Sequence, residues 1–354
     1  TQGVSSAASD VYKRQVLKSP GLLRMKSMVQ STKSFGQLQQ QLDSERRLVS
    51  FDSYDMTIRQ IYEMFIEGAI FVPPEYQRQF VWDEVRESEL IESIFLGIPV
   101  PSLFMATNPD ATWEIVDGVQ RLSTIAHYLS DENEILDLIN RKAALSINGL
   151  EKLSALNGFD FESLPKATQL MFMTRPIRVT VLNDKSDLSV RFDLFERLNT
   201  GGVLLTNQEI RNCIYRGPFN DSLKKVVRLE AFKKVVRLKE SDSKNGTAEE
   251  YALRYFAYLD NYSKFEKSVK GFLNEYMRDN SAKVLNAKRL SLFKSVFATL
   301  AEAFPKGLSR GQTTITPVNL FEAISVGVAL AIMQGVKVDV GRLRELVSDK
   351  NLKK

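Results

Sequence analysis

Residues 113–129 have the sequence Trp-Glu-Ile-Val-Asp-Gly-Val-Gln-Arg-Leu-Ser-Thr-Ile-Ala-His-Tyr-Leu, and their hydrophobic period changes in the middle. Trp113, Ile115 and Val116 are typical of a short strand. The next apolar residues are spaced by three and four positions, which is the stripe of a helix, and they are Leu122, Ile125, Ala126 and Leu129. The stretch therefore predicts a strand, a tight turn and a helix, and the other segments are interpreted outward from this junction.

The turn has the sequence Asp117-Gly118-Val119-Gln120-Arg121, which is typical of an anion-binding site. Unpaired backbone N–H groups and the positive end of the helix dipole meet at the N-terminus of a helix. Gly118 lets a ligand approach the backbone closely, and Arg121 adds a planar, charged group suited to phosphate. The local pattern also allows a structural interpretation, in which Asp117 caps the helix and the next residues form an ordinary solvated first turn.

The composition of the 354-residue chain is that of a globular protein with one or two domains, because 44% of the residues are hydrophobic and 26% are charged. Cys213 is the only cysteine, so no intramolecular disulfide can form, and a reducing, cytoplasmic location is expected. The apolar run at residues 323–336 is too short to cross a membrane and predicts a buried helix.

His127 is the only histidine of the chain. Zinc sites with several histidines and nuclease centres with paired histidines are therefore excluded, and we expect His127 to be a structural residue of its helix. The net charge is +5, but without residues 1–24 the chain has 44 basic and 42 acidic residues. Any nucleic-acid binding must therefore come from local patches.

The first 50 residues are expected to be disordered or artefactual. Residues 4–15 resemble translated sequencing-adapter read-through, so we exclude them from the fold and expect the natural start at Met25 or Met28. A disordered arm or a targeting peptide is the alternative. Residues 29–50 are rich in Gln and Ser, which predicts a flexible or loosely helical lead-in. The expected divisions are 1–50, a mixed domain at 51–217 and a helical region at 218–354.

Within the mixed domain, capping residues and hydrophobic periods predict the elements. Thr57 and Asp83 are expected to cap helices, and residues 205–209 resemble a capped restart of a third. Strands are expected at 102–106, 113–116 and 176–182, and helices at 56–65, 84–96, 117–129, 187–198 and 205–215. Residues 70–74 are expected to be extended. Residues 75–82 are expected to form a loop, which either packs its aromatic residues on the core or presents Arg78 and Gln77 to a pocket.

The helical region contains a short repeat, because Lys-Lys-Val-Val-Arg-Leu at residues 224–229 recurs at 233–238. One interpretation is a basic helix or helix pair that packs through Val and Leu. The other is a patch that contacts phosphates, formed by Lys224, Lys225, Arg228, Lys233, Lys234 and Arg237. Residues 252–259 are rich in aromatic side chains, which predicts a core helix more than a surface for stacking bases.

Three segments together resemble the N-terminal domain family of the GmrSD type IV, modification-dependent restriction endonucleases. They are Tyr76-Gln77-Arg78…Trp82, the segment 115–124 with its Asp-Gly-x-Gln-Arg turn, and Phe195-Glu-Arg-Leu-Asn-Thr-Gly-Gly202. The resemblance covers residues 56–216, and the family has Gln where this chain has Val119. The family is similar to the ParB and sulfiredoxin fold, which implies an α+β class with a small mixed sheet around a nucleotide-binding core.

The resemblance implies binding and hydrolysis of a nucleoside triphosphate with Mg²⁺. Carried over, the phosphate cradle would consist of Asp117, Gly118, Gln120 and Arg121. Gln77 and Arg78 would reach in from the preceding loop, and the segment that would close the site is Asn199, Thr200, Gly201 and Gly202. That last turn is also typical of a helix C-cap or an anion nest. Asp117 would orient water or hold Mg²⁺ and Arg121 would assist catalysis, with Glu114 and Glu196 as weaker candidates.

The resulting hypothesis is a nucleoside-triphosphate-binding, slowly hydrolysing bacterial protein of the restriction or phage-defence type. It would act on DNA or through a separate nuclease subunit, because restriction members of the family carry a C-terminal HNH nuclease domain and this chain has no histidine after His127. The alternative is a non-catalytic DNA- or protein-binding module on the same fold. A nuclease active in its own right would need a spaced carboxylate cluster, which the sequence does not mark. The base of the nucleotide and the oligomeric state stay open.

Overall fold

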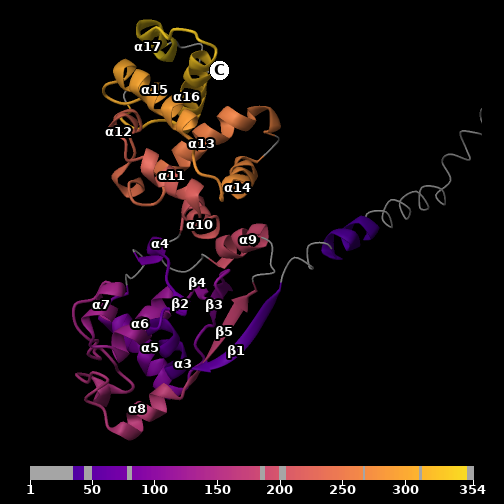
Figure 1. Cartoon of the computed structure of the whole chain (residues 1–354). Helices are drawn as coiled ribbons and strands as arrows, with labels where there is room; N and C mark the ends of the chain where they lie inside the picture. Colours follow the sequence, from indigo (N-terminus) through magenta and orange to yellow (C-terminus); the bar gives the residue numbers. More distant parts are fainter. Residues whose placement is uncertain are drawn as a thin grey trace, which may run out of the picture. The chain divides into compact units, whose positions relative to one another are not determined.

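A computed structural model describes residues 35–43, 50–77, 82–183, 188–198, 205–265, 268–310 and 313–348 (Figure 1). The contacts divide the chain into two units, one formed by residues 1–50 with 185–187 and the other by 51–184 with 188–354. In the first unit, residues 35–43 are helical and expose Phe35, Leu38 and Leu42. The predicted starts at Met25 and Met28 lie outside the described residues, and the domain boundary near residue 217 stays a prediction.

The second unit contains a five-stranded mixed sheet, which confirms the α+β class with a small mixed sheet. Its strands are β1 (Phe51–Thr57), β2 (Ile70–Phe71), β3 (Leu103–Thr107), β4 (Trp113–Asp117) and β5 (Pro176–Leu182), and their order is β1-β5-β3-β4-β2. The pairs β1·β5 and β3·β4 are antiparallel, whereas β3·β5 and β2·β4 are parallel. The sequence did not predict β1, because its alternating polar residues lie on an exposed edge strand.

Helices that contact one another lie beside the sheet, as Figure 1 shows for α3 (Ile58–Ile66), α5 (Glu84–Leu96) and α6 (Val119–Leu129). The predicted caps are confirmed, since Thr57 forms a capping box at α3 and the Asp83 carboxylate accepts the N–H of Arg86 at α5. The further elements of this part are α7 (Asn133–Leu138), η1 (Ser154–Leu156) and α8 (Lys166–Met173).

The segment after β2 corrects one prediction. Residues 75–82 were expected to be a loop, but Pro74–Gln77 form a short helix, α4. Proline is favoured in the first turn of a helix, where its missing N–H costs no hydrogen bond, so the prolines that end the strand also start this helix. Residues 78–81 lie outside the described residues.

Two helices follow the last strand. They are α9 (Leu188–Leu198), which contacts β4, and α10 (Asn207–Ile214), which contacts α4 and α9. Thr206 forms a capping box with Glu209 at α10, which confirms the predicted restart. The expected beginning of α9 at Asp187 and the turn at residues 199–202 lie outside the described part of the chain.

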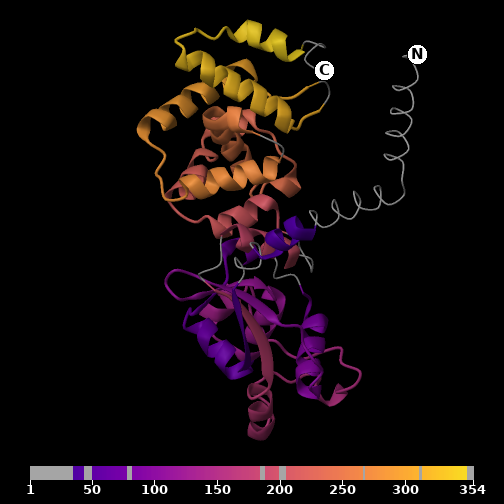
Figure 2. The ribbon, with the colours of Figure 1, turned by 90° about the vertical axis from the view of Figure 1, so that its right-hand side faces the viewer.

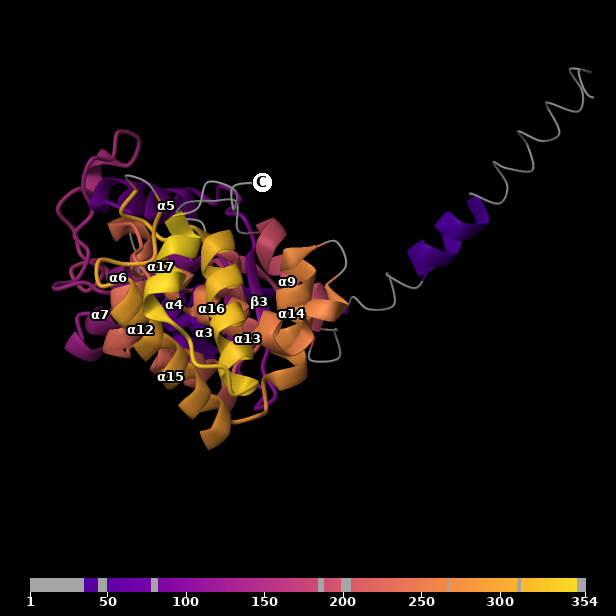
Figure 3. The ribbon, with the colours of Figure 1, turned by 90° about the horizontal axis from the view of Figure 1, so that it is seen from above.

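The chain beyond Gly217 is helical in its described residues, as predicted (Figure 2, salmon through orange to yellow). The elements are α11 (Pro218–Val226), α12 (Glu230–Val235), η2 (Glu240–Asp242), α13 (Thr247–Asn261), η3 (Tyr262–Lys264), α14 (Val269–Asn280), α15 (Ala287–Ala303), α16 (Val318–Met333) and α17 (Val340–Ser348). Helix α15 contacts α12, α16 and α17 (Figure 3). No helix in the described ranges is long and apolar enough to span a membrane.

Aromatic side chains form the centre of this helical region. The rings of Phe293 and Phe297 lie 4.3 Å apart, and Tyr255, Phe256 and Phe232 pack against them. All five are at most 1% exposed. Since Tyr255 and Phe256 belong to the aromatic segment 252–259, its interpretation as a core helix is confirmed, and these two rings are not available for stacking bases.

Candidate functional site

The predicted anion-binding turn lies at one edge of the sheet. Strands β2 and β4 run parallel, so their carboxyl ends meet at the same edge, where α4 follows β2 and the turn at Asp117 and Gly118 follows β4. Ligands of open α/β sheets bind outside the carboxyl ends of parallel strands. Helix α6 starts here with Val119, so the positive end of its dipole lies at the same edge.

Gly118 is the N-cap of α6 and has left-handed backbone angles, φ 99° and ψ 16°. A Cβ atom at this position would lie 2.5 Å from Leu103 Cδ2 and 3.0 Å from Arg121 Nη2. The space that a side chain would fill is therefore occupied by Leu103 on one side and by the guanidinium on the other. Only glycine combines this conformation with so close an approach.

Arg121 and Asp117 form an ion pair across the turn, with 2.7 Å between Nη2 and Oδ2. The interpretation of Asp117 as the N-cap of α6 is wrong. The N-cap residue is Gly118, and no side chain forms a capping hydrogen bond there. Asp117 instead holds Arg121 against the turn. The Asp117 side chain is 30% exposed and the Arg121 side chain is 12% exposed. Because this ion pair is formed through a single guanidinium nitrogen, the fork geometry of the group suits a further anion.

Residues on both sides of the segment 78–81 are tied to this turn. The Tyr76 hydroxyl donates to the carbonyl of Val116 at 3.2 Å, and the N–H of Trp82 donates to Gln120 Oε1 at 3.3 Å. Gln120 was predicted to be part of the phosphate cradle, and the structure gives its side chain this additional role of positioning Trp82. Gln77 belongs to α4, whereas Arg78 lies outside the described residues.

A buried ionic cluster, which sequence analysis did not find, supports the same part of the fold. Glu87 Oε2 lies 2.8 Å from His127 Nδ1, and Glu87 Oε1 accepts from Arg141 at 2.7 Å. The other ring nitrogen of His127 lies 2.8 Å from the carbonyl of Ala143, and Arg141 also donates to the carbonyl of Trp82. His127 is thus a buried structural residue, as predicted, and its two partners are acceptors when Glu87 is ionised.

Replacing His127 by phenylalanine is expected to lower the free energy of unfolding by about 2 kcal/mol, because it removes the ring nitrogens that lie 2.8 Å from the carbonyl of Ala143 and from one oxygen of Glu87. Tyr128→Phe is the matched control. Tyr128 is equally buried and follows on the same helix, but its hydroxyl has no partner among the described residues, so its loss should cost nothing. Urea unfolding of both variants measures the difference, and equal effects would contradict the structural role of the cluster.

The other predicted carboxylates are engaged in ion pairs. Glu114 Oε2 lies 2.9 Å from Arg216 Nη1, and Glu196 Oε2 lies 2.5 Å from Lys270 Nζ. No group of three or more His, Cys, Asp or Glu side chains that could hold a metal occurs among the described residues. Asp117 is therefore the carboxylate best placed at the turn. The closing segment Asn199, Thr200, Gly201 and Gly202 lies outside the described residues, so its role stays a prediction.

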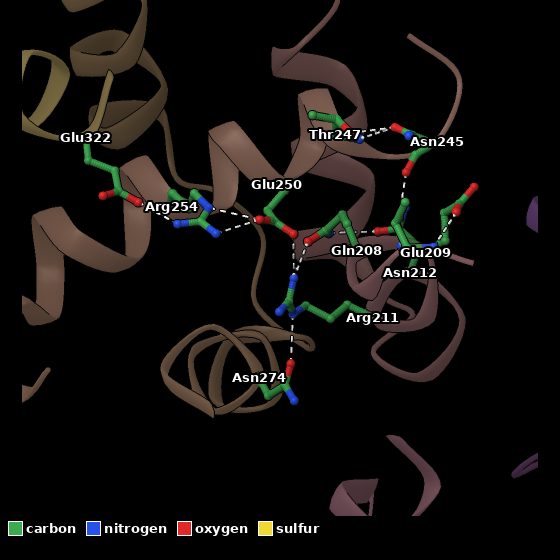
Figure 4. Close-up of polar contacts among 11 residues, drawn as sticks. Gln208, Glu209, Arg211, Asn212, Asn245, Thr247, Glu250, Arg254, Asn274 and Glu322 are labelled. Atoms are coloured by element: carbon green, nitrogen blue, oxygen red, sulfur yellow. Dashed lines mark hydrogen bonds and ion pairs between the residues drawn. The ribbon is translucent and has the colours of Figure 1, made fainter. Parts of the chain in front are cut away.

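A second polar network surrounds Arg211 of α10, whose side chain is 1% exposed (Figure 4). Its guanidinium donates to Glu250 at 3.1 Å, to Gln208 at 3.1 Å and to Asn274 at 2.8 Å. Arg254 holds the other oxygen of Glu250 at 2.7 Å. The network joins α10 to α13 and α14, and nothing in the sequence pattern marked it.

The two copies of the basic repeat have similar positions. In each, the Lys-Lys pair belongs to the last turn of a helix, α11 for Lys224 and Lys225 and α12 for Lys233 and Lys234. Positive side chains are favourable at this end of the helix dipole. The valines that follow are buried, which agrees with a helix pair that packs through Val. Arg228 and Arg237 lie after their helices and are exposed.

Comparison with known proteins gave one family. Residues 58–216 match the family model described as "GmrSD restriction endonuclease, N-terminal domain". The matched range includes α3 through α10 and therefore the turn at Asp117, the buried cluster around Glu87 and the start of the Arg211 network. No curated protein and no solved structure matched the chain.

Proposed function

From the premise that residues 58–216 are a GmrSD restriction endonuclease N-terminal domain, we propose that the chain binds a nucleoside triphosphate with Mg²⁺ at the Asp117–Arg121 turn. The domain indicates a role of the restriction or phage-defence type. We further infer that the sheet has the ParB and sulfiredoxin type of core. Binding and slow hydrolysis of the nucleotide would switch the association of the protein with DNA or with a nuclease partner.

The geometry of the turn carries this proposal. Arg121 is held by Asp117 at 2.7 Å against Gly118, where Leu103 and the guanidinium leave no room for a side chain. A phosphate placed here would meet the first N–H groups of α6 and the guanidinium together. Phosphoryl transfer depends mainly on positioning and on neutralising charge, which are the contributions that such a turn can make.

The residues present fit a Mg²⁺–nucleotide as ligand. Mg²⁺ is commonly held by one or two carboxylates together with waters and substrate phosphates, and Asp117 offers one carboxylate that is 30% exposed. When bound, the ion would neutralise charge on the phosphates. Asp117 therefore has two tasks in the proposal, to orient Arg121 and to contact the ion. Gln120 keeps Trp82 beside the turn through the bond to its backbone N–H.

The second candidate function is a non-catalytic DNA- or protein-binding module. It is favoured by the exposed basic residues of α11 and α12, which lie outside the matched range. The dependence of DNA affinity on salt and on nucleotide distinguishes the two functions. A module should lose affinity for DNA steeply with salt and ignore nucleotide, whereas a switch changes its DNA or partner affinity when nucleotide binds, because coupling between two sites is reciprocal.

The test is calorimetric titration of the protein with ATP, GTP, CTP and UTP in the presence of Mg²⁺. We expect one or more of them to bind, and Arg121→Ala to weaken that binding at least about tenfold, because it removes a charge-assisted contact to phosphate. Arg178→Ala is the matched control, since Arg178 forms an equivalent ion pair with Asp55 at 2.9 Å in an exposed position. No binding of any of the four by the folded wild-type protein would refute the proposal.

A further inference from the structure

The charges of the chain are divided unequally along the sequence. Residues 218–354 contain 25 Lys and Arg against 15 Asp and Glu, a net charge of +10. Residues 25–217 contain 19 basic and 27 acidic residues, a net charge of −8. The overall charge of +5 hides this division. A long polyanion such as a nucleic acid, which contacts an extended surface, is therefore attracted more strongly to the helical region than to the acidic remainder of the chain.

The structure joins the second copy of the basic repeat to a segment about 70 residues further along the chain. The N–H of Leu308 donates to the carbonyl of Val235 at 2.9 Å. A Cβ atom at Gly307 would lie 2.5 Å from Arg237 Cγ, so the stem of Arg237 lies directly on the backbone of Gly307. Through this contact Arg237, which follows Lys233 and Lys234 in the chain, lies on the segment that carries Lys306 and Arg310. We call these five residues the basic ridge.

Two surface cavities border the basic ridge. One, of about 370 Å³, is lined by Lys233, Lys234 and Arg237 together with Ala231 and Glu230. Its single carboxylate, Glu230, is 89% exposed and pairs with Lys233 at 2.9 Å, an interaction that contributes little in solvent. The other cavity, of about 500 Å³, contains Lys306, Gly307 and Arg310 and has no Asp or Glu in its lining.

A third arginine beside the second cavity has a structural role. Arg344 donates from Nε to the carbonyl of Ala303 and from Nη2 to that of Glu302, at 2.7 and 2.9 Å. These carbonyls belong to the last turn of α15, where a positive side chain satisfies the helix end. Arg344 thus lines the second cavity with its guanidinium engaged by backbone carbonyls, beside Lys306 and Arg310.

We propose that the basic ridge binds the phosphate backbone of double-stranded DNA. Lysines and arginines set in neighbouring shallow cavities suit a row of phosphates, and such contacts carry affinity without reading the sequence. That the polyanion is DNA rests on the proposed function, because it follows from the restriction-type domain. The proposal assigns DNA to the helical region and nucleotide to the sheet edge, two places with opposite net charge.

The repeat supplies a matched pair of variants for the test. Lys233→Gln, Lys234→Gln and Arg237→Gln together remove three charges of the ridge, and the control combines Lys224→Gln, Lys225→Gln and Arg228→Gln in the equivalent positions of the first copy. Fluorescence anisotropy with a short DNA duplex measures affinity against salt. For the ridge variant we expect a loss of at least about tenfold and a decrease in the salt slope of about 2–3, since each phosphate contact contributes about 0.9. The control should stay within about twofold.

Each other outcome overturns the assignment. Equal losses in both variants would mean that only the net charge matters, and no loss in either would place DNA elsewhere. Tighter binding of single-stranded DNA or RNA than of the duplex would refute the choice of ligand. Wild-type protein that binds no DNA would leave an acidic protein as the partner of the ridge. Nucleotide titration of the same preparations distinguishes the proposal for the turn from the proposal for the ridge. If no nucleotide binds but the ridge variant alone loses affinity for DNA, only the nucleotide switch is refuted.

Discussion

Gly118→Ala is expected to lower the free energy of unfolding by about 3 kcal/mol and to abolish nucleotide binding at the turn. The backbone angle φ of 99° costs an L-residue about 1–2 kcal/mol. The new Cβ would also lie 2.5 Å from Leu103 Cδ2 and 3.0 Å from Arg121 Nη2, and relieving such overlap costs about 1–3 kcal/mol. Since Arg121 must move, the anion site changes together with the stability.

Gly68→Ala separates the cost of the left-handed backbone from the cost of the steric overlap. Gly68 also has a positive φ, 75°, but a Cβ there would have no atom within 4 Å. Its substitution should therefore cost only the conformational part, about 1 kcal/mol, and should leave nucleotide titration unchanged. Urea unfolding of both variants gives the comparison. If the two substitutions lower the free energy of unfolding equally, the close approach of Leu103 and Arg121 to Gly118 does not contribute to the loss.

Glu250→Gln is expected to have the largest effect on stability, a loss of about 3–5 kcal/mol, because it leaves the buried guanidinium of Arg211 without a carboxylate. Arg211 is 1% exposed, and its remaining partners in the network are the neutral amides of Gln208 and Asn274. Glu322→Gln is the control within the same network. Glu322 pairs with Arg254, which keeps Glu250 as a partner, so its loss should cost at most about 1 kcal/mol.

The same carboxylate makes stability depend on pH in a defined direction. Burial alone would raise the pKa of Glu250, but the charges of Arg211 and Arg254 and their hydrogen bonds outweigh it, so the pKa lies below its ordinary value of 4.5. A lowered pKa in the folded state gives stability that is complete above that ordinary value and is lost as the pH falls below it. Unfolding measured between about pH 6 and pH 3 should show this loss in the wild type and a smaller one in Glu250→Gln.

Structural features that depend on residues close together in the chain could be predicted from the sequence. The caps at Thr57, Asp83 and Thr206 depend on hydrogen bonds to the third residue onward, and all three were recognised. The strand, turn and helix around Gly118 followed from a change of period. The cap role given to Asp117 was wrong because a left-handed glycine took the N-cap position and the carboxylate turned to Arg121.

Features formed between distant residues could not be predicted. Arg211 meets Glu250 and Asn274, which follow it by 39 and 63 residues, and no local pattern marks a buried arginine on a polar helix. The hydrogen bond from the N–H of Trp82 to Gln120 likewise joins residues that are 38 positions apart in the sequence. The short helix α4 was missed because Pro73 and Pro74 were assigned to an extended segment and the residues after them to a loop, although proline also starts helices.

The pairing of β1 with β5 has a consequence for biosynthesis. Phe51 pairs with Leu182 and Thr57 with Pro176, so the edge strand made first meets its partner only after more than a hundred further residues have been translated. At about 5–20 residues per second the delay is on the order of 10 s. Until then β3 also lacks β5, its parallel neighbour. The nascent chain therefore carries an incomplete sheet until β5 has been translated, and its unpaired strand edges can pair with other chains during that time.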